Sequence, residues 1–192
     1  MNRRDLLKFA GGTLLNGALV GGGAAALILP ANATTPTSPS PARAAEARRL
    51  AFLNTHTGDT FADAYWEAGN YVPDAMVAIN HVMRDHRSGE TYAIDPRLLD
   101  QLHSLRGVVE TQTPYQIISG YRSPASNAAL QEGSSGVATR SLHMQGRAID
   151  IRIRGVDTAR LRDAALGLSA GGVGYYQASD FIHVDTGRVR RW

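Results

Sequence analysis

Residues 146–155 read GRAIDIRIRG, and this stretch limits the possible folds more than any other part of the chain. Apolar and polar residues alternate, so in a β-strand the three isoleucines share one face and Asp150 lies on the other. A carboxylate inside such a strand is costly to bury unless a cationic partner offsets its lost hydration. The stretch therefore predicts a half-buried strand whose polar face needs an arginine or a divalent cation beside Asp150.

Apolar spacing elsewhere switches between the periods of strands and helices. Alternation predicts β-hairpins over 49–66 and 171–187 and a strand over 115–119. Spacings of three and four residues predict helices over 73–87, 95–109 and 157–168, with one or two helical turns over 126–133. We therefore expect an α+β domain with an antiparallel sheet, built largely from the C-terminal half, and flanking helices.

The first 33 residues have the pattern of an export signal. Arg3 and Arg4 precede an uncharged apolar run, and the small residues 31–33 (Ala-Asn-Ala) form a cleavage site for signal peptidase. The adjacent arginines predict a twin-arginine signal, and hence the twin-arginine translocase as partner and the periplasm as location. Several glycines dilute the apolar run, which disfavours the alternative of an uncleaved membrane anchor, and no stable membrane span is expected after cleavage.

The domain boundaries follow from where the composition of the chain changes. Residues 34–47 read TTPTSPSPARAAEA, which is typical of a flexible linker, and 48–192 form the predicted folded domain. The chain has no cysteine, so stability must come from an apolar core. Removal of 1–33 takes away three basic residues and one acidic residue, which lowers the formal net charge from +3 to +1. A nucleic-acid partner is therefore not expected.

Two histidines are candidates to join Asp150 in a metal site. His143 lies on the loop that enters the predicted strand, and His183 lies in the later strand DFIHVD. A catalytic zinc ion usually has three protein ligands and one open position. The alternative is a loop histidine with Asp150 paired to an arginine. The remaining histidines in the predicted helices, at positions 81, 86 and 103, are expected to be surface or packing residues.

Several motifs in order resemble one family. SLHMQGRAID fits the SxHxxGxAxD pattern of the zinc D-Ala-D-Ala carboxypeptidases and murein endopeptidases, which are related to lysostaphin-type and Hedgehog-type zinc sites. SGYRS resembles the arginine motif of this group, and FIHVDTG resembles its last metal-ligand strand. The resemblance extends over nearly all of 48–192 and is closest to the murein endopeptidase branch. It implies the Hedgehog/DD-peptidase-like zinc peptidase fold.

The resemblance also implies roles for particular residues. His143, Asp150 and His183 would bind Zn²⁺, and Arg122 would stabilise the oxyanion of the transition state or hold a substrate carboxylate. Two aspartates compete for the general base. Asp180 lies three residues before His183, and Asp185 lies two residues after it, where strand geometry places it on the same side. Asp185 is favoured, although it could instead orient His183.

The function implied is zinc-dependent hydrolysis of peptide cross-links between peptidoglycan stem peptides, outside the cytoplasm. A D-Ala-D-Ala carboxypeptidase is the alternative within the same enzyme class. A murein-binding module that has lost turnover is the alternative from another class, and the intact set of ligands argues against it.

Overall fold

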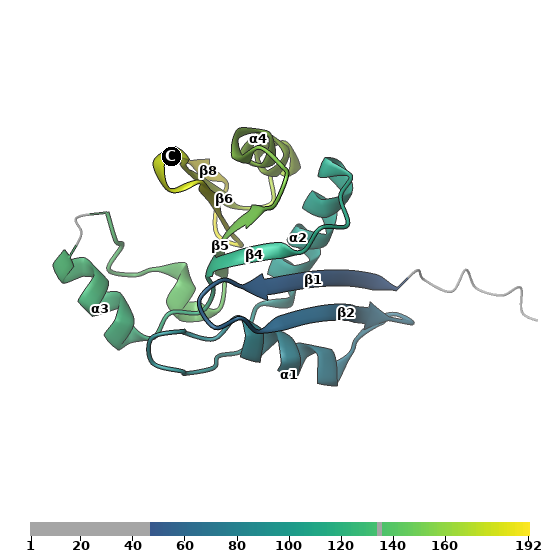
Figure 1. The fold of residues 1–192 in the computed structure, drawn as a ribbon, viewed down its shortest axis with the longest axis horizontal. Coiled ribbons are helices and arrows are strands. Elements are labelled where there is room, and N and C mark those ends of the chain that lie inside the picture. Colours follow the sequence, from purple (N-terminus) through teal and green to yellow (C-terminus); the bar gives the residue numbers. More distant parts are fainter. Residues whose placement is uncertain (1–46, 134–135) are drawn as a thin grey trace, which may run out of the picture. The chain divides into compact units, whose positions relative to one another are not determined.

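The computed structural model describes residues 47–133 and 136–192, which form one mixed α+β unit (Figure 1). Its strands form a single sheet in the order β3-β2-β1-β4-β5-β7-β6-β8. The strands are β1 (Arg48–Asn54), β2 (Thr60–Glu67), β3 (Asn70–Tyr71), β4 (Tyr115–Ser119), β5 (Ala148–Ile153), β6 (Gly172–Tyr176), β7 (Phe181–Asp185) and β8 (Arg190–Arg191). The helices are α1 (Pro73–Val82), α2 (Pro96–Val109), α3 (Pro124–Gly133) and α4 (Thr158–Leu168), with 3₁₀ turns η1 (Leu142–Gln145) and η2 (Gln177–Ser179).

The sheet is mixed, so the prediction of an antiparallel sheet is only partly right. Both predicted hairpins are present, as the antiparallel pairs β1–β2 and β6–β7. However, β4 runs parallel to β1, and β8 runs parallel to β6. Between β1 and β4 the chain passes through a hairpin and two helices, which is the long crossover that a parallel pair requires. The apolar pattern of a strand does not encode such pairings, because they depend on the route of the intervening chain.

Three helices cover the apolar side of the sheet. Helix α1 packs on β1 and β2, α2 packs on β1 and α4, and α4 packs on β5, β6 and β7. The isoleucines of β5 are fully buried in the core that these elements share, as the alternation predicts. Because β5 lies between β4 and β7, Asp150 is held in the middle of the sheet. None of the helices among the described residues has the length and apolar character needed to cross a membrane.

Helix α1 ends at Val82 rather than near Arg87, which corrects the sequence prediction and places His86 in a loop. The loop is fixed by Asp85, whose carboxylate accepts hydrogen bonds from the backbone N–H groups of Arg87 at 2.9 Å and Ser123 at 2.8 Å. Burial alone raises the pKa of Asp85, but these donors and Ser126 hold it below its usual value. The loop after β4 is thereby anchored to the end of α1.

Gly120 makes the second contact between these two segments. The Tyr121 N–H donates to the carbonyl oxygen of Met83 at 2.7 Å, and a Cβ atom on Gly120 would overlap that same oxygen. Glycine is therefore required at position 120 because two backbones approach closely there.

We expect Gly120→Ala to lower the free energy of unfolding by about 1–3 kcal/mol, since the added methyl group meets backbone that cannot rotate away. Gly107→Ala is the matched control. Nothing lies within 4 Å of a Cβ at this helical position, and alanine should raise stability by up to about 1 kcal/mol. Urea denaturation of both variants measures the difference, and equal midpoints would contradict the steric argument.

Candidate metal centre

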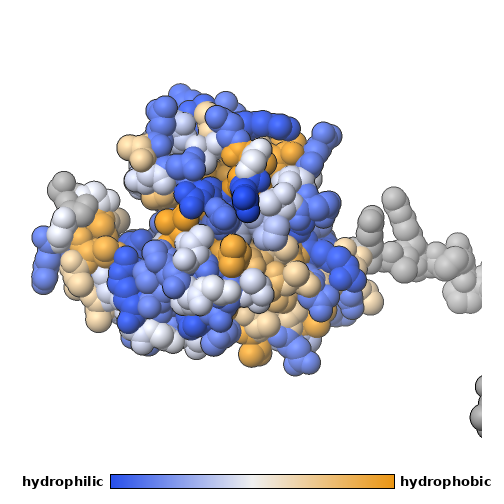
Figure 2. Space-filling model, in the orientation of Figure 1, coloured by the Kyte–Doolittle hydropathy of each residue, from blue (hydrophilic) through white to orange (hydrophobic). Residues whose placement is uncertain are grey.

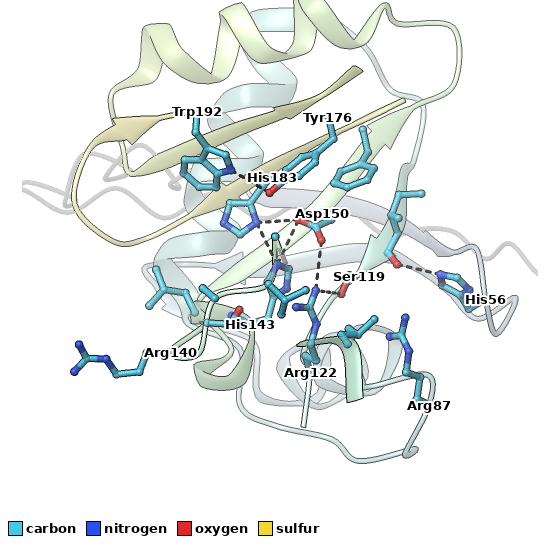
Figure 3. Close-up of a pocket in the computed structure, with 18 of the residues that line it drawn as sticks. His56, Arg87, Ser119, Arg122, Arg140, His143, Asp150, Tyr176, His183 and Trp192 are labelled. Carbon is cyan, nitrogen blue, oxygen red and sulfur yellow. Dashed lines mark hydrogen bonds and ion pairs between the residues drawn. The ribbon is translucent and has the colours of Figure 1, made fainter. Parts of the chain in front are cut away.

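Three predicted ligands meet at one point, although they come from different elements (Figure 3). Asp150 of β5 lies directly opposite His183 of β7 in the antiparallel register. His143 lies in η1, where the Ser141 hydroxyl caps the turn by accepting from the His143 N–H at 3.3 Å. All three residues are buried, and one ligand atom from each lies within 4.8 Å of the others. The structure therefore brings together the His143, Asp150 and His183 set that the motifs indicate.

In each imidazole, the ring nitrogen that points away from the other ligands (the outer nitrogen) has a hydrogen-bond acceptor beside it. His143 Nδ1 lies 2.7 Å from the carbonyl oxygen of Gly120, which can only accept, so Nδ1 carries the proton. His183 Nε2 lies 3.0 Å from Asp185 Oδ2. Burial alone raises the pKa of Asp185, but His183, Arg190 and the Gly187 N–H hold it below its usual value. The ionised carboxylate accepts from His183 Nε2, which must carry a proton as well.

When both rings are neutral, the inner nitrogens therefore present lone pairs to each other. His143 Nε2 and His183 Nδ1 are 3.1 Å apart, and Asp150 Oδ1 lies 3.3 Å and 2.8 Å from them respectively. Three acceptors at these distances repel one another unless a proton or a metal ion lies among them. Two imidazole nitrogens and one carboxylate oxygen are a ligand set typical of catalytic zinc, and they leave a fourth position free. The residues present therefore fit a zinc ion.

The pKa shifts around the cluster show that it attracts positive charge, either as a proton or as a metal ion. Burial alone raises the pKa of Asp150, yet the two histidines hold it well below its usual range, so this carboxyl group is ionised. Burial alone lowers the pKa of His183, yet Asp150 and Asp185 raise it above its usual value. Both shifts express the same electrostatics, in which two buried carboxylates attract positive charge to the imidazoles.

Asp185 lies behind His183 rather than beside the inner nitrogens. It is fully buried and accepts hydrogen bonds from the N–H groups of Gly172 at 3.1 Å and Gly187 at 2.8 Å. Arg190 adds two more bonds, at 3.0 Å and 2.7 Å. Together with His183 Nε2, these donors occupy both carboxylate oxygens. The arrangement suits a group that fixes the ring of His183 and leaves it little capacity to exchange protons with a substrate.

Asp180 points to other partners. It lies in a left-handed turn with φ of 51° at the end of η2, just before β7. Its Oδ1 accepts from the Thr158 hydroxyl at 3.0 Å, and its Oδ2 lies 3.6 Å from Arg152. The side chain is 65% exposed and does not line the cleft that contains the three ligands.

Arg122 lies beside the cluster in a cleft of about 650 Å³. Its Nη2 is 3.8 Å from Asp150 Oδ2 and 3.4 Å from the Ser119 hydroxyl, and its Nη1 donates to Asn127 at 3.4 Å. Burial lowers the pKa of the guanidinium, while Asp150 opposes that shift. Among the described residues, no hydrogen-bond partner reaches the buried Nε. A donor is therefore held next to the three ligands with hydrogen-bonding capacity left over.

Two residues of the C-terminal segment complete the site, and the sequence patterns did not single them out. Arg190 holds Asp185 through a hydrogen-bonded ion pair. The ring centroids of Trp192 and His183 lie 5.2 Å apart. Trp192 fits there because Gly174, which pairs with His183 in the sheet, has no side chain to obstruct it. Glycine inside a strand often marks such a close approach. The glycines of GGVGYY were therefore the available signal.

Known proteins resemble this chain along its length. Residues 42–192 match the profile of a peptidase family described as Peptidoglycan L,D-endopeptidase MepK. Peptidoglycan L,D-endopeptidase MepK of Escherichia coli (strain K12) is 42% identical over 191 residues, which cover 100% of this chain and 97% of that protein. The Probable peptidoglycan L,D-endopeptidase MepK of Haemophilus influenzae is 38% identical over 146 residues, covering 76% of this chain and 78% of the relative. The chain belongs to the MepK family of M15 peptidases.

Proposed function

We propose that this chain is a zinc-dependent peptidoglycan endopeptidase that cleaves peptide cross-links between stem peptides. One observation carries the metal dependence: both imidazoles have their outer nitrogens committed, so three acceptors face one point. Membership in the MepK family supports a hydrolytic peptidase acting on murein, and it favours an endopeptidase over a D-Ala-D-Ala carboxypeptidase.

His143, Asp150 and His183 would hold the zinc ion. When bound, a zinc ion would supply a Lewis acid that can polarise a peptide carbonyl and lower the pKa of water to about 7. The protein supplies rigidity: the Gly120 carbonyl fixes one imidazole and Asp185 fixes the other. Such outer partners orient the ligands and raise their basicity.

Arg122 would stabilise the negative charge that forms on the substrate carbonyl oxygen. Its guanidinium is buried beside Asp150 and needs little reorganisation to act. An oriented donor of this kind contributes most where charge develops only in the transition state. Between the two candidate bases, we assign Asp185 to orienting His183, because its oxygens are occupied by other donors.

The location follows from the N-terminal sequence. We propose export by the twin-arginine route, removal of 1–33 and action in the periplasm, with 34–47 as the linker. These segments lie outside the described residues, apart from Ala47. The alignment with the relative from strain K12 covers the whole chain, so the resemblance includes this N-terminal region.

Digestion of purified murein sacculi tests the function. We expect the zinc-loaded protein to remove cross-linked dimers, as measured by muropeptide chromatography, and a chelated sample to leave them intact. His183→Ala should lower the rate at least about 10³-fold. The three proposed ligands act as a unit, so the loss of one should disable the zinc site as a whole.

The matched control is His81→Ala, which removes an exposed histidine of α1 and should digest like wild type. Dimers that persist with the zinc-loaded wild type would refute the endopeptidase. Monomers shortened by one D-Ala would identify the carboxypeptidase instead. Binding to sacculi without any product would identify a murein-binding module.

Zinc affinity separates the two aspartates. Asp185→Asn replaces the acceptor of His183 Nε2 with an amide, and we expect zinc to bind about 10–100-fold more weakly in a chelator competition. Asp180→Asn should leave zinc affinity within about twofold, because its partners are Thr158 and Arg152. If Asp185→Asn kept full zinc affinity and lost turnover, Asp185 would be the proton carrier.

Arg122→Lys tests the oxyanion assignment. Lysine keeps the charge but loses the guanidinium geometry, and we expect kcat to fall about 10²-fold with a small change in KM. Initial rates on a purified cross-linked dimer give both constants, with thermal unfolding as the check on folding. A rise in KM at constant kcat would instead show that Arg122 binds a carboxylate of the stem peptide.

A further inference from the structure

The cleft around the three ligands is basic. Four arginines line it, whereas Asp150 is the one carboxylate that does so among the described residues. Figure 2 shows the surface hollowed between α3 and the C-terminal strands, where residues of both segments line this cleft. The predicted mature chain has a formal net charge of only +1. The excess of positive charge is therefore a property of the cleft rather than of the surface as a whole.

Two of the four arginines already have acidic partners. Arg122 faces Asp150 at 3.8 Å, and Arg190 holds Asp185 at 2.7 Å. The other two, Arg87 and Arg140, are exposed at the cleft, and no aspartate or glutamate of the described chain forms an ion pair with either. Their guanidinium groups are thus available to a ligand.

Both arginines lie on backbone that is tied to the centre. The Arg87 N–H donates to Asp85, which also accepts from the Ser123 N–H beside Arg122. Arg140 directly precedes Ser141, the cap of the turn that carries His143. In Figure 3, Arg87 and Arg140 lie on opposite sides of Arg122 and His143. The charges therefore flank the place where a scissile peptide bond would lie.

Arg87 carries the positive charge at its end of the cleft, next to a stacked pair of histidines. The rings of His56 and His86 stack there with centroids 3.8 Å apart, and His56 also lines the cleft. Burial, His56 and Arg87 lower the pKa of His86 to about 4, so His86 is neutral at pH 7. Asp85 is the nearest acid on this loop, but its oxygens are occupied by backbone donors.

We propose that Arg87 and Arg140 form two subsites that bind free carboxylates of the substrate peptide, one on each side of the scissile bond. The proposal rests on the proposed endopeptidase function and adds substrate selectivity to it. A guanidinium binds a carboxylate through paired charge-assisted hydrogen bonds, whereas an amidated carboxyl group has no charge to offer. Two such subsites require a free carboxylate on each side of the bond, and a cross-linked pair of stem peptides can offer both.

Cross-linked muropeptide dimers with free or amidated carboxyl groups test this inference. We expect the wild type to prefer the free form in kcat/KM. Arg87→Gln and Arg140→Gln should each lower that preference about three- to tenfold, the range for exposed charge pairs and hydrogen bonds to charged groups. The loss should come mainly from KM. Arg154→Gln is the matched control, since Arg154 is exposed and outside the cleft, and it should keep the wild-type preference.

A binding measurement separates this inference from the proposed function. His183→Ala retains both arginines, and titration calorimetry with the two dimers gives their affinities without turnover. Tighter binding of the free form, lost when Arg87→Gln or Arg140→Gln is added, supports the subsites even if no cleavage is observed. Equal behaviour of the two dimers in both assays overturns the proposal, as does a loss of equal size in Arg154→Gln.

Discussion

Asp150 is buried in the middle strand of the sheet, directly opposite His183, and much of the site serves to balance its charge. A carboxylate in this position would be too costly to bury alone. The two imidazoles and Arg122 surround it, and the isoleucines on the other side of β5 hold the strand in the core. The alternation of GRAIDIRIRG thus has two purposes: one face makes the core and the other positions a ligand.

Each imidazole is held by a partner that comes from a different part of the fold. The Gly120 carbonyl that fixes His143 belongs to a loop anchored by Met83 and Asp85, at the end of α1. On the other side, Arg190 of β8 holds the Asp185 that fixes His183. The N-terminal half of the domain therefore contributes no ligand, yet it sets the direction of one ligand through backbone contacts.

The sequence was sufficient to predict features that depend on local periodicity or on motif spacing. These include the hairpins, the main helices and the meeting of His143, Asp150 and His183 at one point, since a motif with several fixed positions constrains identity and order together. Features that depend on the path of the chain were not predictable. The parallel pairing of β4 with β1 and the early end of α1 are examples. The direction of Asp185 is another: strand spacing places it near His183, but Arg190 and two backbone N–H groups decide which nitrogen it reaches.

The distance in sequence between the three proposed ligands would couple metal binding to folding. Asp150 lies seven residues after His143, and His183 lies 33 residues after Asp150 on a strand that must first pair with β5. An unfolded chain has no such arrangement, so a metal ion would bind the folded form preferentially and stabilise it by mass action. In the folded state, the two lone pairs and the carboxylate repel one another unless positive charge lies among them. The arrangement that prepares the site for a metal ion also raises the pKa of His183, so a metal ion would have to displace a proton from this ring.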